Sequence, residues 1–212
     1  MMKSSFKKDL GDEKILGNYL DSIYYKIFNP EEFILTRVWD SERQNSGIDL
    51  IIHHLTSSQN FYVDEKAQLD YINLELPTFT FETSYLKNGE LKQGWLYDDS
   101  KKTNYYFLVT SILCKGPRIS SGIESIKIHS IDRLKLKQLL NDKGLTKSVI
   151  RRYDNEIRNT GKSGAIRVKE LHHIDEGRFY FSKDNKAERP INLVMKLSFL
   201  VRAGVAKVIH EP

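Results

Sequence analysis

The first strong pattern along the chain is helical. Between residues 12 and 28 apolar side chains recur every three or four positions and so share one helix face: Leu16, Tyr19, Leu20, Ile23 and Ile27. Asn29-Pro30 then ends the predicted helix. FILTRVWD (33–40) predicts a strand, and the polar segment SERQNSG after it predicts a loop.

Two further strands are predicted within residues 47–72, on either side of the polar turn TSSQN. In the second strand the alternation places four apolar side chains on one face: Phe61, Val63, Ala67 and Leu69. Asp64 and Lys66 then lie on the opposite face. With a two- or four-residue loop among TSSQ, Asp49 of the first strand lies opposite Lys66 and diagonal to Asp64, so the two carboxylates can share one cation.

The remaining elements alternate between strands and helices. Asn88-Gly89 predicts a hairpin turn, since both residues tolerate positive φ. Periodicity and turn signals predict, in chain order, strands over 78–86, 90–97, 104–113 and 124–130, helices over 131–143 and 146–159, a hairpin of 165–171 with 177–183, a helix over 191–202 and a closing strand over 205–209. The expected fold is therefore α/β, with a mixed central sheet flanked by helices.

Composition places the chain among folded proteins of a reducing compartment. Its 212 residues are 40% hydrophobic and include 11 Tyr, 10 Phe and 2 Trp. The single Cys114 excludes an internal disulfide or a thiolate-cluster metal site. No apolar run is long enough to span a membrane, and the start MMKSSFKKDLGDEK lacks the apolar core of a signal peptide. We therefore expect a cytoplasmic protein without a membrane partner.

Charge is distributed unevenly. The net charge is +5, but residues 1–130 hold 15 Lys and Arg against 18 Asp and Glu, whereas residues 131–212 hold 18 against 10. This asymmetry suits a protein in which one part binds a polyanion and another concentrates carboxylates. A solvated basic surface explains it equally well.

Asp49, Asp64 and Lys66 are the residue types that metal-assisted phosphodiester hydrolysis requires. Mg²⁺ prefers oxygen ligands and retains waters, so two carboxylates can hold it beside a phosphate. A nearby lysine can orient or deprotonate the attacking water and neutralise developing negative charge.

Asp49 followed by Asp64-Glu65-Lys66 resembles the PD-(D/E)XK nuclease superfamily, which includes restriction endonucleases and Holliday-junction resolvases. The resemblance covers roughly residues 10–130. It implies a restriction-endonuclease-like fold, with Mg²⁺, or Mn²⁺ in its place, held by Asp49, Asp64 and the carbonyl of Glu65. It further implies an acidic residue at Glu13 on the first helix, near the metal, and a polar residue at Gln68. The stretch QGWLYDDSKKTNYYFLV is similar to central strands of nuclease-like proteins from phages and mobile elements.

The sequence departs from the family pattern at two positions. Ile48 stands where the family name has proline, and Glu65 occupies a middle position that is usually apolar. The tripeptide Asp/Glu-X-Lys occurs five times, but only Lys66 lies in an apolar-alternating run whose neighbouring strand carries an acid. The alternative is an edge hairpin with a surface ion pair.

Residues 135–159 resemble a helix-turn-helix, with Gly144 between the helices and Thr146 capping the second. Arg151, Arg152 and Arg158 would lie on its outer side, available to nucleic acid. An ordinary helical hairpin with a basic face explains the pattern at least as well. Lys101 and Lys102 are further candidates for phosphate contacts.

These observations predict a nuclease-like core over residues 1–130, with a basic extension over 131–212 packed on it as one domain. The expected function is Mg²⁺-dependent endonucleolytic hydrolysis of DNA, with RNA as another substrate that the sequence leaves open and a homodimer as an alternative to a monomer. Two other classes of function stay open. One is a nucleic-acid-binding module without hydrolysis, and the other is a protein-interaction domain.

Overall fold

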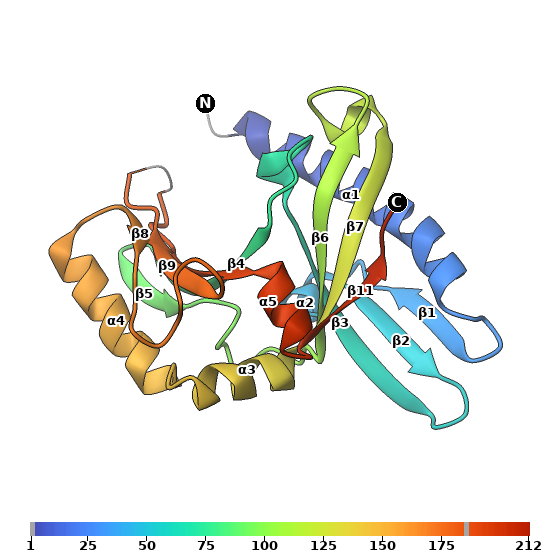
Figure 1. The fold of residues 1–212 in the computed structure, drawn as a ribbon. Coiled ribbons are helices and arrows are strands. Elements are labelled where there is room, and N and C mark those ends of the chain that lie inside the picture. The colour runs from blue at the N-terminus through green and yellow to red at the C-terminus, as the bar shows by residue number, and fades with distance from the viewer. Residues whose placement is uncertain (1–2, 185–186) are drawn as a thin grey trace.

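Two β-sheets and the helices of the C-terminal half share one apolar core, and the N-terminal helix covers the other face of the first sheet (Figure 1). This is the architecture of the computed structural model, which describes residues 3–184 and 187–212. The predicted α/β class, with a mixed sheet flanked by helices, is confirmed. No helix within the described residues is long and apolar enough to cross a membrane.

The first sheet is mixed and has the strand order β1-β2-β3-β6-β7-β11. Its strands are β1 (Phe33–Arg37), β2 (Leu50–His54), β3 (Gln59–Ala67), β6 (Tyr105–Cys114), β7 (Ile123–Asp132) and β11 (Ala206–His210). β3 pairs antiparallel with β2 and parallel with β6, whereas the other pairs of this sheet are antiparallel. The strand that carries Asp64 and Lys66 is therefore an interior strand with a fixed register.

Helix α1 (Lys3–Ile27) covers one face of the first sheet. Its buried side chains follow the predicted stripe, with Tyr24 added to it: Leu16, Leu20, Ile23 and Tyr24. They pack on alternate residues of the strands, including Phe107 and Val109 of β6. The intervening Tyr106 and Leu108 face the other way, into the core shared with the second sheet.

The second sheet is antiparallel and has the order β5-β4-β10-β9-β8. Its strands are β4 (Thr78–Lys87), β5 (Glu90–Gln93), β8 (Gly164–Ile166), β9 (Gly177–Phe181) and β10 (Ile191–Lys196). The helices α3 (Arg133–Asp142), α4 (Lys147–Thr160) and α5 (Leu197–Arg202) contribute to the shared core. Asn88 and Gly89 both have positive φ in the β4–β5 turn, as predicted.

Two predicted elements differ in kind from the structure, and others differ in their bounds, such as helix α1, predicted over 12–28, and strand β5, predicted over 90–97. The predicted helix over 191–202 is strand β10 followed by the short helix α5. β10 lies between β4 and β9 and is mostly buried, so its apolar run lacks the alternation of a half-exposed strand. The predicted loop after β1 contains α2 (Ser41–Asn45), whose N-cap Asp40 accepts from the Arg43 amide at 2.8 Å. Five residues are too few for a helical period to be read.

The segments before and after residue 130 are interleaved. β4 and β5, from the earlier segment, form one sheet with β8, β9 and β10, from the later one. In return, β11 pairs with β7 and closes one edge of the first sheet. The two segments are thus parts of one packed unit.

His129 on β7 makes the stability of this unit sensitive to acid. It is 4% exposed, and its Nδ1 has no hydrogen-bond partner within the described residues. Burial, with a smaller contribution from Lys127, lowers the pKa of His129 to about 4, against the weak opposing charge of Glu211. The folded state therefore binds fewer protons than the unfolded state between pH 4 and 6.5.

We expect His129→Gln to flatten the pH dependence of stability. In the wild type the contribution of His129 is complete above the unfolded pKa of about 6.5 and is lost as pH falls toward 4, by about 3 kcal/mol in all. Urea unfolding at several pH values across this window measures the slope. A slope in the variant equal to that of the wild type contradicts the assignment.

Candidate functional site

The predicted pairing of the charged hairpin has the right faces and the wrong register. β2 and β3 pair antiparallel with Leu50 opposite Val63, so Asp49 lies next to Asp64 and not opposite Lys66. The loop between the strands starts at Leu55, one residue earlier than predicted, and its last residue, Ser58, has φ 56°. Shifting the loop by one position moves the pairing by two, which preserves the faces.

Asp64 and Lys66 point to the same side of β3 and form an ion pair. The Asp64 side chain is 3% exposed, whereas that of Lys66 is 30% exposed. The Lys66 ammonium also lies 5.5 Å from the ring centre of Trp95, a cation–π contact that holds the long side chain. Lys66 can thus reach solvent while Asp64 is enclosed.

The loop that leads into β2 encloses Asp64. Gly47 has φ +74°, and a Cβ there would lie 2.4 Å from Thr103 Oγ1 and 3.5 Å from Asp64 Oδ2. Only glycine fits such an approach. Thr103 Oγ1 donates to the Gly47 carbonyl at 2.8 Å, and Lys101 Nζ donates to the Asn45 carbonyl at 2.6 Å.

Asp49 lies at the start of β2, against the backbone of β3. Its Oδ2 accepts a hydrogen bond from the Glu65 amide at 2.8 Å. Burial, and secondarily the Asp64 carboxylate, raise the pKa of Asp49 to about 7, although Lys66 opposes the shift. The two aspartates therefore lie close enough to repel each other, and the charge of one lysine does not offset their burial.

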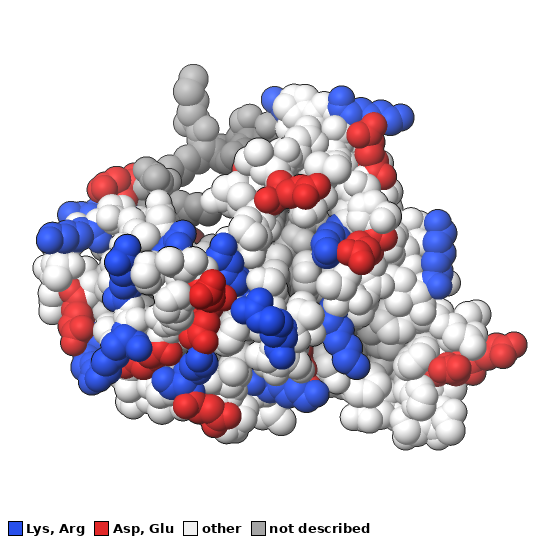
Figure 2. All heavy atoms as spheres, in the orientation of Figure 1, with Lys and Arg blue, Asp and Glu red and all other residues white. Residues whose placement is uncertain are grey.

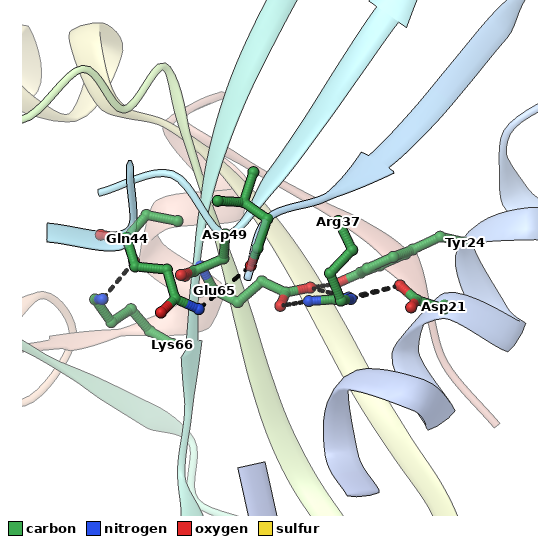
Figure 3. A network of polar contacts seen from close by, with 9 residues as sticks. Asp21, Tyr24, Arg37, Gln44, Asp49, Glu65 and Lys66 are labelled. Carbon is green, nitrogen blue, oxygen red and sulfur yellow. Dashed lines mark hydrogen bonds and ion pairs between the residues drawn. The ribbon is translucent and has the colours of Figure 1, made fainter. Parts of the chain in front are cut away.

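Glu65 points to the opposite face of β3, toward α1 (Figure 3). Its carboxylate accepts from Tyr24 Oη at 2.7 Å and from Arg37 Nη1 and Nη2 at 2.6 and 3.1 Å. Arg37 also contacts Asp21 of α1, with 2.8 Å between Nε and Oδ1. The charge in the usually apolar middle position thus has a bidentate partner, which accounts for its burial.

The pKa shifts in this network keep the Arg37 guanidinium charged and the Tyr24 phenol neutral. Burial alone would lower the pKa of Arg37, but the hydrogen bonds to Glu65 and Asp21 raise it. Burial, and then the Glu65 charge, raise the pKa of the Tyr24 phenol. Glu65 is therefore committed to a structural contact, and its side chain is not available as a metal ligand.

A cavity of about 640 Å³ opens between α1 and this end of the sheet. Its polar lining includes Glu13, Lys14, Asp49 and Lys66, with Trp39 at its wall. Glu13 is exposed and lies on the α1 side of the cavity, as the resemblance implies.

Gln68 has a different environment from the other predicted site residues. Its Nε2 donates to the Thr78 carbonyl at 2.9 Å, and its buried Oε1 has no partner within the described residues. Neither Gln68 nor Asp64 lines the cavity. The structure therefore brings Asp49 and Lys66 together at the cavity, places Asp64 beside Lys66 through their ion pair, and does not bring Gln68 to it.

The predicted nucleic-acid contacts fall into two groups. Lys102, Arg151 and Arg152 are exposed, and Arg152 forms a surface ion pair with Glu156 at 3.7 Å. Arg158 is instead 16% exposed and donates to Asp154, Ser84 and the Arg189 carbonyl. Its i, i+4 pairing with a buried aspartate removes Arg158 from the outer face of α4.

The ligands available for a metal ion are oxygens from two side chains. No group of three or more His, Cys, Asp or Glu side chains that could hold a metal occurs within residues 3–184 and 187–212. Two carboxylates with one main-chain carbonyl suit Mg²⁺, which keeps several waters, better than they suit Zn²⁺ or Ca²⁺. Asp49, Asp64 and the Glu65 carbonyl are compatible with this donor set.

Three residues of this region, Arg37, Tyr24 and Trp39, were not among the predicted site residues. Arg37 gives a faint signal, because it is a cation in an apolar strand segment and Glu65 is an anion in another. Tyr24 falls beside the predicted stripe of α1. Nothing in the sequence pairs Tyr24 and Arg37 with Glu65, since the three residues come from α1, β1 and β3.

No protein-family model, curated protein or solved structure matches the chain. Function is therefore inferred from the chemistry of these side chains.

We expect Arg37→Leu to destabilise the protein by about 3 kcal/mol, because it leaves Glu65 buried without a cation. Glu65→Leu alone should destabilise comparably, and the double variant Arg37→Leu/Glu65→Leu should recover a large part of the loss. Urea unfolding of all four proteins gives the coupling energy. Arg43→Leu, which removes an exposed ion pair with Asp40, serves as the control and should change stability by less than about 1 kcal/mol. Simple additivity of the two single changes would contradict the role of this pair.

Proposed function

We propose that the protein is a Mg²⁺-dependent nuclease that hydrolyses DNA phosphodiester bonds, of the PD-(D/E)XK type. The observation that carries the proposal is the juxtaposition of Asp49, Asp64 and Lys66 on one hairpin, where Asp49 and Lys66 line the cavity and Asp64 is paired with Lys66. These are two acids and one base, the minimal set for hydrolysis assisted by a hard cation.

Each residue has a distinct role in the proposal. Asp49, Asp64 and the carbonyl of Glu65 would hold Mg²⁺, which lowers the pKa of its bound water and neutralises phosphate charge. Lys66 Nζ orients the attacking water and donates to the phosphate, since its side chain reaches solvent. Glu13 of α1, which lines the same cavity as Asp49 and Lys66, would support the ion through water.

The charge balance of the site supports a cation. Asp64 makes its ion pair with Lys66, and no ion pair of Asp49 occurs within the described residues. A pKa of about 7 means that the Asp49 anion is poorly stabilised by the protein alone. A divalent ion supplies the missing positive charge, and relief of this repulsion contributes to its binding.

Further support comes from the fold and from the single cysteine. A mixed sheet flanked by helices, with the acids at one end of its strands, agrees with what the resemblance implies. Cys114 is buried and unpaired, which suits the reducing cytoplasm.

One observation favours a second candidate, a nucleic-acid-binding module without hydrolysis. Asp64 is already paired with Lys66 and is enclosed by the loop at Gly47. If that ion pair persists in solution with Mg²⁺ present, neither side chain is free for catalysis. Binding assays alone do not separate the two candidates, whereas cleavage does.

We expect the protein to nick supercoiled plasmid in Mg²⁺ or Mn²⁺, and EDTA to abolish the reaction. Asp64→Asn and Lys66→Met should each lower the rate by about 100-fold or more, because the first removes a ligand of the metal ion and the second removes the group that orients the attacking water. The rate of conversion to the open-circular form measures the effect.

The chain provides a matched control for these variants. Glu90-Leu91-Lys92 has the same acid-X-lysine spacing and an ion pair at 2.6 Å, but it lies exposed on β5. Glu90→Gln should leave nicking unchanged.

Mg²⁺ should also raise the thermal midpoint of the wild type and not that of Asp64→Asn. Equal nicking by wild type and Asp64→Asn would refute the assignment, and DNA binding without nicking would favour the module.

We expect DNA binding to weaken steeply with salt. Figure 2 shows Lys and Arg side chains, interspersed with acidic ones, over the part of the molecule that includes α3 and α4. Arg151→Ala should weaken binding and reduce the slope of log K against log salt by about 1, if Arg151 contacts one phosphate. Arg158→Ala should lower stability because Asp154 loses its partner. Fluorescence anisotropy between about 50 and 200 mM NaCl measures the slope. A slope unchanged by Arg151→Ala would remove this residue from the interface.

A further inference from the structure

Trp39 is a large aromatic side chain that the fold leaves exposed at the proposed site. It lies two residues beyond the end of β1, its exposed fraction is 58%, and it lines the cavity together with Asp49 and Lys66. Of the large hydrophobic side chains that are exposed within the described residues, Trp39 alone lines this cavity.

The ring is supported from behind by α1. A Cβ placed on Gly17 would lie 3.6 Å from Trp39 Cη2, so the indole rests close to the helix backbone at a point where no side chain intervenes. The Arg37 guanidinium carbon lies 5.9 Å from the ring centre. Arg37 is itself held by Glu65 and Asp21, so this side of the indole faces a rigid support.

The backbone beside Trp39 is tied to the metal-binding aspartate. The Val38 amide donates to the Asp49 carbonyl at 2.8 Å, and the Gln44 side chain donates to the Val38 carbonyl at 3.3 Å (Figure 3). The position of the indole is therefore coupled to that of Asp49 through a single residue. A group bound against the indole would lie beside the proposed reaction centre.

The chemistry around the indole favours a nucleobase as its partner. An exposed indole lacks the favourable free energy of burial. A flat apolar ligand that stacks on the ring removes it from water and so provides part of that free energy. Lys14 and Lys66 line the same cavity and supply positive charge for phosphates on either side of a stacked base. An apolar protein segment would instead bury Lys14 and further desolvate the Lys66–Asp64 ion pair without adding a partner for either lysine.

We propose that Trp39 is a substrate-positioning residue, which stacks on an unpaired nucleobase next to the cleaved phosphodiester. This inference rests on the proposed nuclease function and deepens it. Bases inside a duplex are already stacked on their neighbours, so the indole can receive only a base that is unpaired or flipped out. The substrate class is therefore nucleic acid with unpaired nucleotides, such as single strands, overhangs or branch points.

Binding and cleavage of a short single-stranded oligonucleotide test the proposal. We expect Trp39→Ala to weaken binding about 10-fold or more and to lower the cleavage rate at subsaturating substrate, whereas Trp39→Phe should retain most of both. Tyr25→Ala is the matched control, since Tyr25 is 67% exposed on α1 and does not line the cavity. It should behave as the wild type.

A series of oligonucleotides, each with one abasic position, identifies the stacked base. For the wild type, removal of one particular base should weaken binding as much as Trp39→Ala does, and that position should have no further effect in Trp39→Ala. Fluorescence of Trp39, taken as the difference between the wild type and Trp39→Phe, should be quenched by the intact oligonucleotide and less by that abasic one.

The outcomes separate this inference from the nuclease assignment. Cleavage by the wild type, with Trp39→Ala binding and cleaving equally well, would overturn the stacking role and leave the nuclease intact. Binding with quenching of Trp39 but without cleavage would support the stacking role and remove the nuclease. Neither binding nor cleavage would overturn both.

Discussion

The ion pair between Glu65 and Arg37 is the constraint on which the site depends. Glu65 belongs to an interior strand, and its carboxylate points toward a helix whose contacting face is apolar, where an isolated charge would cost several kcal/mol. Arg37 of β1 donates two hydrogen bonds to this carboxylate, and Tyr24 of α1 donates a third. One side chain thus connects three elements that are far apart in the sequence.

The two faces of β3 separate a structural contact from the proposed site. The Glu65 carboxylate binds Arg37 of β1 and Tyr24 of α1 on one face of β3. Its neighbours Asp64 and Lys66 point to the opposite face and form their own ion pair. Glu65 also serves the other face through its amide, which donates to Asp49. A movement of β3 relative to α1 would therefore displace Asp49, Asp64 and Lys66 together. Rigid support of this kind is what a site with few ligands requires.

Sequence alone predicted most of the elements, because the apolar periods of α1, β3 and α4 are regular and β6 is a long apolar run between turn signals. It placed Asp49 near Asp64 correctly in face, since alternation along a strand decides that. It failed on register, because a polar loop such as TSSQN can turn at more than one position. It also failed on β10, whose burial between two strands removes the alternation. The partners of Glu65 could not be predicted, because they depend on how α1 crosses the sheet.

The pairing of β11 with β7 has a consequence for synthesis on the ribosome. Until residues 206–210 emerge, β7 presents an unpaired strand edge, and such edges recruit strands from other chains. One edge of β4 in the second sheet also stays unpaired, because its partner β10 is synthesised about a hundred residues later. Both sheets therefore close late, and the nascent chain depends on rapid capture of its last strands to escape aggregation.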